Sequence, residues 1–181
     1  MNKASSGDTI YIDNANGQPY EECGNSPNAI QIKKSLSFIC PVGVAEIQCR
    51  THTRNHNIFE IPKNLPGKQT ISFTSIKFTS AVWAVDNRHD NTRIVIKRCL
   101  FENTAGAIWM YNQGKCHLEV DNSLFIDNQN YGIYGQCANV SVRLSSVTFR
   151  SSPVRLYNSN GLLFEVFIEG SFFTEIFHVN N

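Results

Sequence analysis

Apolar residues recur along this chain with a period of about 24 residues. An apolar, variable, apolar triplet, followed by small or polar residues and then a phenylalanine, occurs five times. The triplets begin at Ile71, Ile94, Leu118, Val142 and Val166, and the phenylalanines are Phe78, Phe101, Phe125, Phe149 and Phe173. The intervals between the phenylalanines are 23, 24, 24 and 24 residues. Alternating apolar positions indicate strands with one buried side, so each unit is predicted to form two short strands joined by a tight bend.

A third short strand is predicted later in each unit. The four segments are Val82-Trp83-Ala84, Ile108-Trp109-Met110, Ile133-Tyr134-Gly135 and Val154-Arg155-Leu156. Three strands in about 24 residues describe one coil of a parallel β-helix, in which each strand pairs with its equivalents in the coils above and below. We therefore predict an all-β, single-stranded parallel β-helix of about seven coils, with residues 1–181 forming one domain.

Equivalent residues of successive coils lie above one another in such a solenoid, so the repeat also predicts columns of like side chains. Two inward columns are Ile71, Ile94, Leu118, Val142, Val166 and Phe73, Ile96, Val120, Leu144, Ile168, and the phenylalanine ladder is a third. The bend positions are Ser75, Arg98, Asn122, Ser146 and Gly170. Apart from Arg98, these residues tolerate turn or left-handed conformations. Cys99 falls in an inward column with Ile76, Ser123, Val147 and Ser171, where we expect a buried thiol.

The main alternative fold is a leucine-rich repeat, which has a similar period. It fits poorly, because the repeated positions here are Ile, Val and Phe and no segment has helical periodicity. Solenoid ends are usually capped, so residues 1–8 are a candidate N-terminal cap. Residues 176–180 look like the start of another strand. This predicts an incomplete C-terminal coil, a fragment of a longer protein, and an exposed edge covered by more chain or by another subunit.

Two segments near the N-terminus carry a family resemblance. Ala4-Ser5-Ser6-Gly7-Asp8-Thr9-Ile10-Tyr11-Ile12 and residues 29–39 resemble the first and second coils of pectin-lyase-like β-helix proteins. The resemblance covers the whole chain and implies a right-handed parallel β-helix. It does not specify an activity, because this fold carries lyases, hydrolases, adhesins and inert spacers. The paired aspartates and the Gly-His-Gly and Arg-Ile-Lys signatures of the family's hydrolases are absent, and residues 93–97 are a loose echo of the last.

Charge and composition exclude some classes of partner. Sixteen basic and fifteen acidic residues give a formal charge of +1, so no global field would attract nucleic acid or an acidic membrane. No apolar run approaches the roughly 18 to 20 residues that span a bilayer, and no signal peptide precedes Gly7. Six cysteines and the sequon Asn139-Val140-Ser141 favour a trimmed extracellular or cell-surface fragment with Asn139 as the glycosylation acceptor.

Candidate catalytic residues are weak in this sequence. Enzymes of this fold that cleave acidic polysaccharides need convergent carboxylates on neighbouring coils. The exposed column of the first strand reads Ser72, Val95, Glu119, Arg143 and Phe167, which is not an acidic cluster. The best local group is Asp86, His89 and Asp90, in a predicted loop after a third strand. It is either a metal or acid/base site or, as we favour, a solvated turn. We expect no metal and no cofactor.

The outward position of the third strand is a candidate ligand-binding stripe. Its residues are Trp83, Trp109, Tyr134 and Arg155, with Phe59 before them and Phe177 after them. Flat rings one coil apart suit stacking against a sugar chain or a protein partner. Alternatively, the loop of residues 62–67 covers the rings, or the rings simply stack across strands.

The cysteines are interpreted as disulfide staples, because no C-x-x-C motif occurs. Cys116 and Cys137 are predicted to lie in turns of adjacent coils, where a disulfide is geometrically reasonable. Cys23 with Cys49 is the first choice for a second pair, and Cys40 with Cys49 is the alternative. An unpaired Cys40 would be reactive or buried.

These observations favour a non-enzymatic extracellular β-helix module that presents a binding face for glycan or protein ligands within a larger surface or secreted protein. One alternative is a carbohydrate-active enzyme, either a polysaccharide lyase or a glycoside hydrolase, or a fragment of one. A second alternative is a structural spacer that self-assembles through the C-terminal coil edge.

Overall fold

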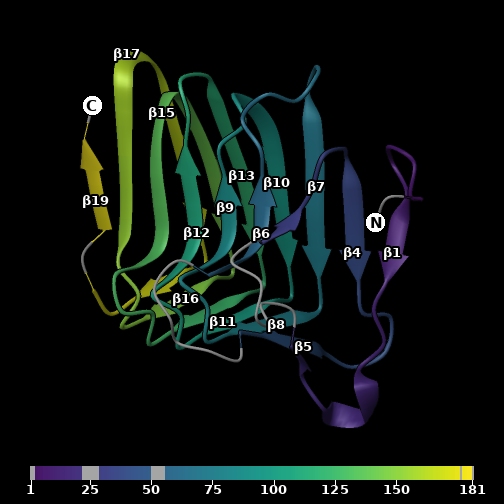
Figure 1. Cartoon of the computed structure of the whole chain (residues 1–181). Helices are drawn as coiled ribbons and strands as arrows, with labels where there is room; N and C mark the ends of the chain where they lie inside the picture. Colours follow the sequence, from purple (N-terminus) through teal and green to yellow (C-terminus); the bar gives the residue numbers. More distant parts are fainter. Residues whose placement is uncertain (1–2, 22–28, 50–55, 176, 181) are drawn as a thin grey trace.

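The structure is a computed structural model that describes residues 3–21, 29–49, 56–175 and 177–180. The chain winds into a parallel β-solenoid, as Figure 1 shows, and each strand pairs in parallel with equivalents one coil away. The described elements comprise β-strands and one short 3-10 helix, η1 (Ala15–Gly17). The all-β parallel solenoid is thereby confirmed, and the leucine-rich repeat is excluded.

Three stacks of strands surround the core. The first stack contains β1 (Thr9–Tyr11), β4 (Leu36–Ile39), β7 (Gln69–Thr74), β10 (Asn91–Lys97), β13 (Lys115–Asp121) and the C-terminal parts of β15 (Tyr131–Ser145) and β17 (Val154–Glu169). The second stack contains β2 (Tyr20–Glu21), β5 (Ala45–Gln48), β8 (Ile76–Thr79), β11 (Leu100–Glu102), β14 (Leu124–Ile126), β16 (Thr148–Arg150) and β18 (Phe172–Phe173). The third stack contains β3 (Ile30–Gln31), β6 (Asn57–Ile61), β9 (Trp83–Asn87), β12 (Gly106–Tyr111), the N-terminal parts of β15 and β17, and β19 (Phe177–Asn180).

The solenoid has about six turns, slightly fewer than the seven coils predicted. The second stack holds seven strands in the described part of the chain, and seven stacked levels are separated by six turns. β15 and β17 each run continuously from the third stack into the first, so these two stacks join into one twelve-stranded sheet. At the levels of β15 and β17, an uninterrupted strand forms the corner between the third and first stacks. At the earlier levels, a loop forms this corner.

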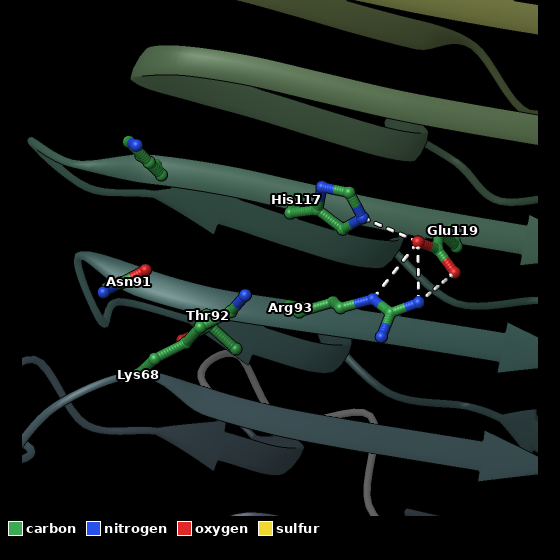
Figure 2. A pocket seen from close by; sticks show the side chains of 7 residues that line it. Lys68, Asn91, Thr92, Arg93, His117 and Glu119 are labelled. Carbon is green, nitrogen blue, oxygen red and sulfur yellow. Dashed lines mark hydrogen bonds and ion pairs between the residues drawn. The ribbon is translucent and has the colours of Figure 1, made fainter.

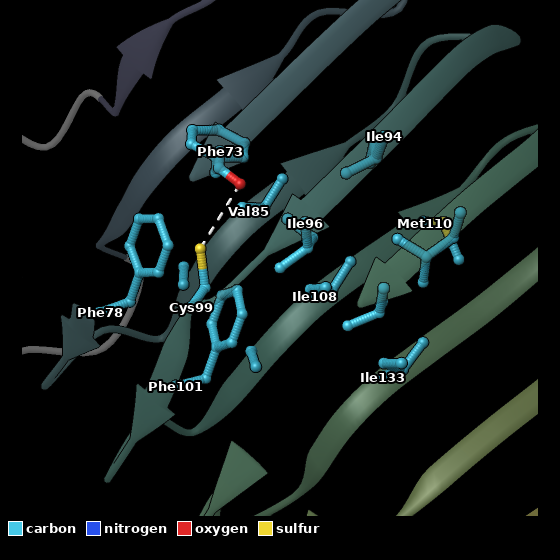
Figure 3. Close-up of a cluster of buried hydrophobic side chains, with 14 of the residues drawn as sticks. Phe73, Phe78, Val85, Ile94, Ile96, Cys99, Phe101, Ile108, Met110 and Ile133 are labelled. Carbon is cyan, nitrogen blue, oxygen red and sulfur yellow. Dashed lines mark hydrogen bonds between the residues drawn. The ribbon is translucent and has the colours of Figure 1, made fainter. Parts of the chain in front are cut away.

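The predicted inward columns are confirmed by the register of the first stack. Ile71, Ile94, Leu118, Val142 and Val166 pair in succession. In the second stack the phenylalanine ladder forms, and consecutive rings from Phe78 to Phe173 stack with centroids 4.9, 4.7, 4.6 and 4.9 Å apart. Figure 3 shows Phe78 and Phe101 of this ladder facing Phe73, Val85 and Ile108 across the interior. Each of the last five second-stack strands thus contributes one aromatic ring to a continuous, close-packed core, whereas Ile47 occupies this position one level before Phe78.

Two columns of residues in the left-handed backbone conformation form the bends between strands. Ser75, Arg98, Asn122, Ser146 and Gly170 all have φ between 46° and 57°. A second column of Ser80, Asn103, Asp127 and Ser151 follows the second-stack strands. Arg98 did not fit the sequence interpretation, because a long side chain is uncommon at positive φ. Its backbone nevertheless follows the column, and its amide donates to the carbonyl of Asp121 one coil away at 3.1 Å.

Cys99 is a buried free thiol, as the inward column predicted. Its Sγ donates to the Phe73 carbonyl at 3.5 Å, an interaction drawn in Figure 3. Burial raises the pKa of the thiol to about 11, so the group stays protonated at neutral pH. Cys99 is therefore a packing residue rather than a nucleophile.

The terminal levels are less enclosed than the middle of the solenoid. At the last level Leu163, Phe167, Ile168 and Phe172 are exposed. Near the start, the Gly7 amide donates to the Ser35 carbonyl and ties the segment before β1 to the next level. The predicted cap of residues 1–8, the incomplete last coil and association through the C-terminal edge stay predictions, and residues 1, 2, 176 and 181 lie outside the described part. In the described residues, no helix has the length and apolarity needed to cross a membrane.

Phe125→Ala should lower the free energy of unfolding by roughly 3 to 5 kcal/mol, because it opens a cavity in the middle of the ring ladder. Equilibrium urea unfolding followed by far-UV circular dichroism measures the change. Phe172→Ala is the matched control, since that ring is 61% exposed, and it should change the free energy by less than about 0.5 kcal/mol. Similar losses in both variants would contradict the ladder.

Candidate functional site

The outward face of the third stack carries the candidate binding residues. Its central column consists of Glu60, Asp86, Trp109, Tyr134, Arg155 and His178, paired strand by strand. A second column, nearer the start of each strand, consists of Asn57, Trp83, Gly106 and Tyr131. Trp109, Tyr134 and Arg155 therefore lie one coil apart, in the order that the sequence predicted.

The predicted position of Trp83 in this stripe is wrong. Trp83 lies level with Gly106, and Asp86 occupies the place beside Trp109. The error arose because Val82-Trp83-Ala84 was aligned with Ile108-Trp109-Met110, whereas Val85 is the residue that pairs with Ile108. Phe59 and Phe177 also leave the stripe: Phe59 is buried in the core and Phe177 packs against it. The outward stripe starts with a carboxylate rather than an aromatic ring.

The Trp83 side chain packs over Gly106 and reaches Trp109 and Tyr131. An added Cβ at Gly106 would stand 1.9 Å from the Trp83 ring, so that ring occupies the space a side chain would take. The Trp83 ring packs edge-on against Trp109 at 4.4 Å and stacks with Tyr131, one coil beyond Gly106, at 6.4 Å and an interplanar angle of 7°. Gly106 is thus the residue that lets two rings, two coils apart, approach each other.

Six rings form one contiguous surface, which we call the aromatic platform: Trp83, Trp109, Tyr111, Tyr131, Tyr134 and Tyr157. Trp109 contacts Tyr134 at 5.0 Å and Tyr111 at 6.2 Å, and Tyr134 contacts Tyr131 at 5.1 Å and Tyr157 at 5.9 Å between ring centroids. The Arg155 guanidinium lies 5.4 Å from the centre of the Tyr131 ring and 5.9 Å from that of Tyr157. Arg155 therefore stabilises the packing of these two rings and does not continue the row of exposed rings.

A groove runs along the platform. One part, of about 480 Å³, is lined by Asn57, Val82, Trp83, Asp86, Arg88, Trp109 and Tyr111. The adjoining part, of about 760 Å³, is lined by Lys63, Arg88, Tyr111, Asn112, Gln113, Gln136 and Ser159. Arg88 and Tyr111 belong to both parts, so they form one feature, which we call the aromatic groove. Its first half contains three aromatic rings, those of Trp83, Trp109 and Tyr111, and its second half is mainly polar.

Asp86 lies at the floor of the groove and fixes Arg88. The carboxylate is 3% exposed, and its Oδ2 accepts from Asn57 Nδ2 at 2.8 Å and from Arg88 Nε and Nη2 at 3.0 and 2.7 Å. Its Oδ1 has no hydrogen-bond partner among the described residues. Burial raises the pKa of Asp86, and the hydrogen bonds from Arg88 oppose that rise. The pair places a guanidinium at the junction of the two halves of the groove.

Asp86, His89 and Asp90 do not converge on a common point. The His89 Nε2 donates to the Leu65 carbonyl at 3.0 Å, and its Nδ1 accepts from the Asn91 amide at 3.0 Å. The Asp90 Oδ1 accepts from the Gln113 amide at 2.9 Å. Asp86 is part of β9, and both it and His89 are buried, so the favoured interpretation as a solvated turn is wrong. No metal-binding group of three His, Cys, Asp or Glu occurs in the described ranges.

One disulfide links adjacent coils beside the groove. Cys116 and Cys137 form this bond, with Cα atoms 5.9 Å apart, which confirms the predicted pair. Both residues are buried and lie in β13 and β15 rather than in turns. Cys49 is also disulfide-bonded, whereas its predicted partner Cys23 lies outside the described residues. Cys40 is a free, buried thiol, which excludes the alternative pairing of Cys40 with Cys49.

The sequence analysis missed several residues of the aromatic platform and the groove. Tyr111, Gln136 and Tyr157 each follow a predicted stripe residue by two positions, so simple strand alternation would have placed them on the same face. Tyr131 and Lys63 carried no such signal. Tyr131 enters the platform through the register with Gly106, and Lys63 is brought in by the loop between β6 and β7.

Comparison with protein-family models, with curated proteins and with solved structures finds no match to this chain.

Gly106→Ala should displace the Trp83 ring, because the new methyl group needs the space that the ring occupies. Both tryptophans of the chain belong to the platform, so tryptophan bands in near-UV circular dichroism report this region alone. We expect those bands to change while the far-UV spectrum is kept, with a destabilisation of roughly 1 to 3 kcal/mol. In a Trp83→Ala background the same substitution should be nearly silent. An equally large effect there would contradict the packing of Trp83 on Gly106.

Proposed function

We propose that this chain is an extracellular β-helix module, of the pectin-lyase-like kind, that binds a glycan along the aromatic groove without transforming it. The observation that carries the proposal is the aromatic platform. Its six rings form a chain of contacts over four successive strands, β9, β12, β15 and β17, and the lining of the groove extends from β6 to β17.

Flat aromatic rings suit the apolar faces of sugar rings, and tyrosine adds a hydroxyl at the edge. Tyr111 is 53% exposed, and the remaining rings of the platform are partly exposed. The loop of residues 62–67 does not remove the platform from solvent, because its Lys63 lines the polar half of the groove while its Leu65 packs against the core. Cross-strand stacking explains why the rings lie in this order. It does not explain why they remain exposed, and exposed rings of this kind support the proposal of a bound ligand.

The polar half of the groove offers groups that pair with sugar hydroxyls. Gln113 and Ser159 are exposed, and Gln136 is half-buried with its Oε1 accepting from the Tyr134 hydroxyl at 2.8 Å. The Gln136 amide group and the Ser159 hydroxyl can both donate and accept. Lys63 and Arg88 also line this half. The groove thus combines rings for stacking with polar and cationic groups that can orient a ligand by hydrogen bonds.

Binding without turnover is supported by the state of the carboxylates at the groove. Asp86 and Glu60 both face Arg88, at 2.7 and 3.9 Å respectively. General acid and base catalysis of glycoside cleavage needs two carboxyl groups on either side of the scissile bond. Here the two lie on adjacent coils of one column and share one guanidinium, an arrangement that suits a structural role.

A carbohydrate-active enzyme is the second candidate, and one observation favours it. Asp86 is a buried carboxyl with a raised pKa that lines a groove, which is a common property of catalytic acids. A screen for release of reducing ends or unsaturated products from neutral and acidic polysaccharides, with and without calcium, tests it. Turnover by the wild type that disappears in Asp86→Ala would replace the binding proposal by the enzymatic one.

The extracellular location rests on the Cys116–Cys137 disulfide, since such bonds persist in oxidising compartments. We propose Asn139 as an N-glycosylation acceptor in that setting. It is partly exposed and follows the irregularity in β15 between Cys137 and Asn139.

The Trp83→Ala/Trp109→Ala double variant should lose glycan binding by at least about 30-fold, or roughly 2 kcal/mol, because it removes the centre of the platform. A glycan array identifies the ligand, and titration calorimetry with that ligand gives the affinities of the wild type and the variant. Tyr11→Ala is the matched control, since Tyr11 is an exposed ring of the first stack, away from the groove. Its affinity should equal that of the wild type.

Retained glycan affinity in the double variant, with the fold intact by far-UV circular dichroism, would contradict the groove as the site. A wild-type array without hits would contradict the glycan proposal and favour a protein ligand or a spacer role.

A further inference from the structure

A second candidate site lies on the outward face of the first stack, away from the aromatic groove (Figure 2). A depression of about 390 Å³ is lined by Lys68, Asn91, Thr92, Arg93, Lys115, His117 and Glu119. These residues come from three successive levels: the residue before β7, the start of β10 and the start of β13. The side chains are hydrophilic, and four of them are basic.

The two lysines stand on opposite sides of the depression. Asn91 pairs with Lys115, and Lys68 precedes Gln69, which pairs with Thr92, so Lys68 lies level with Asn91 on its other side. Two strand spacings separate the backbones of Lys68 and Lys115 by about 10 Å. Both lysines are exposed, and neither ammonium group has an ion pair or hydrogen bond among the described residues.

Arg93 and His117 lie between the lysines and Glu119, and hydrogen bonds to Glu119 fix both side chains. The Arg93 Nε and Nη2 donate to Glu119 at 2.8 to 3.1 Å, and His117 Nε2 lies 2.7 Å from Glu119 Oε1. The hydrogen bonds from Arg93 lower the pKa of Glu119, so it remains ionised and its charge is compensated. Figure 2 shows the Arg93 Nη1 on the side of the guanidinium away from Glu119, and no described residue accepts from it.

The depression therefore carries a local excess of positive charge. Lys68, Arg93 and Lys115 against Glu119 give a formal charge of +2, although the whole chain carries +1. The patch is also bounded. In the column of His117 the following residues are Ser141 and Glu165, and further along β13 stands Asp121. A nucleic-acid backbone needs an extended basic surface, whereas this patch fits one compact anionic group.

We propose that Lys68, Arg93 and Lys115 bind a tetrahedral oxyanion, the sulfate or phosphate ester of an anionic saccharide. Such a group has three terminal oxygens and can accept from donors on three sides at once, whereas a carboxylate has two oxygens and suits a single bidentate partner. The donors here are the two ammonium groups and the Arg93 Nη1, whereas the His117 ring donates its Nε2 proton to Glu119. A saccharide fits the disulfide-bonded, extracellular setting. The proposal does not depend on the aromatic groove.

The test is affinity capillary electrophoresis of the whole protein with three probes: a heparin-derived hexasaccharide, the same hexasaccharide after complete desulfation, and mannose 6-phosphate. Asn139 pairs with Lys115, so the protein is enzymatically deglycosylated first to keep an N-glycan from covering the lysine. The wild type should bind the sulfated hexasaccharide or the phosphate ester at least tenfold more tightly than the desulfated probe. The preferred probe identifies which ester the pocket takes.

Lys68→Ala/Lys115→Ala should weaken binding of the preferred probe at least tenfold. Lys97→Ala is the matched control, because Lys97 is an exposed lysine at the far end of β10 and outside the depression, and it should bind as the wild type does. The Trp83→Ala/Trp109→Ala variant should also keep its affinity for this probe. Absence of wild-type binding, equal binding of the desulfated probe, or equal losses in the Lys97→Ala and double-lysine variants would each overturn the proposal.

Discussion

Parallel pairing of every strand with its equivalent one coil away is the constraint on which the rest of this structure depends. It fixes the vertical separation of side chains at about 4.8 Å, a spacing at which aromatic rings stack in contact. The phenylalanine ladder follows from it directly, since ring centroids from Phe78 to Phe173 are 4.6 to 4.9 Å apart. The same spacing on the outside creates the aromatic platform and sets the two lysines of the charged depression on either side of Asn91.

The core could be predicted from the sequence because the apolar alternation that defines it is local and occurs again in each coil. Each coil restates the alternation that directs Ile94 and Ile96 inward, so five copies determine the register of the first and second stacks without ambiguity. The third stack lacks this redundancy. Val82 and Val85 offered two apolar alignments with Ile108, and the choice of Val82 placed a tryptophan where Asp86 stands. A shift of three positions changed the composition of the stripe while leaving the fold class untouched.

The candidate chemistry was harder to predict because it depends on contacts between coils. Asp86, His89 and Asp90 lie within five consecutive residues and suggested a common site. The structure gives each a different partner: Arg88 for Asp86, the Leu65 carbonyl for His89 and the Gln113 amide for Asp90. Neither Leu65 nor Gln113 has a sequence signal that points to these bonds. Gly106 determines the position of Trp83 because it has no side chain and leaves room for the ring. The pattern of apolar residues in the sequence does not predict this contact.

The buried turn at His89 connects the two outward faces. A backbone carbonyl can only accept a hydrogen bond, so the proton of the His89 ring is on Nε2, facing Leu65, while Nδ1 accepts from the Asn91 amide. His89 thereby ties the loop before β7 to the corner between the third and first stacks. That loop carries Lys63 into the aromatic groove and leads to Lys68 at the charged depression. His89 thus has a positional role, because it holds the loop that lies between both outward faces of the solenoid.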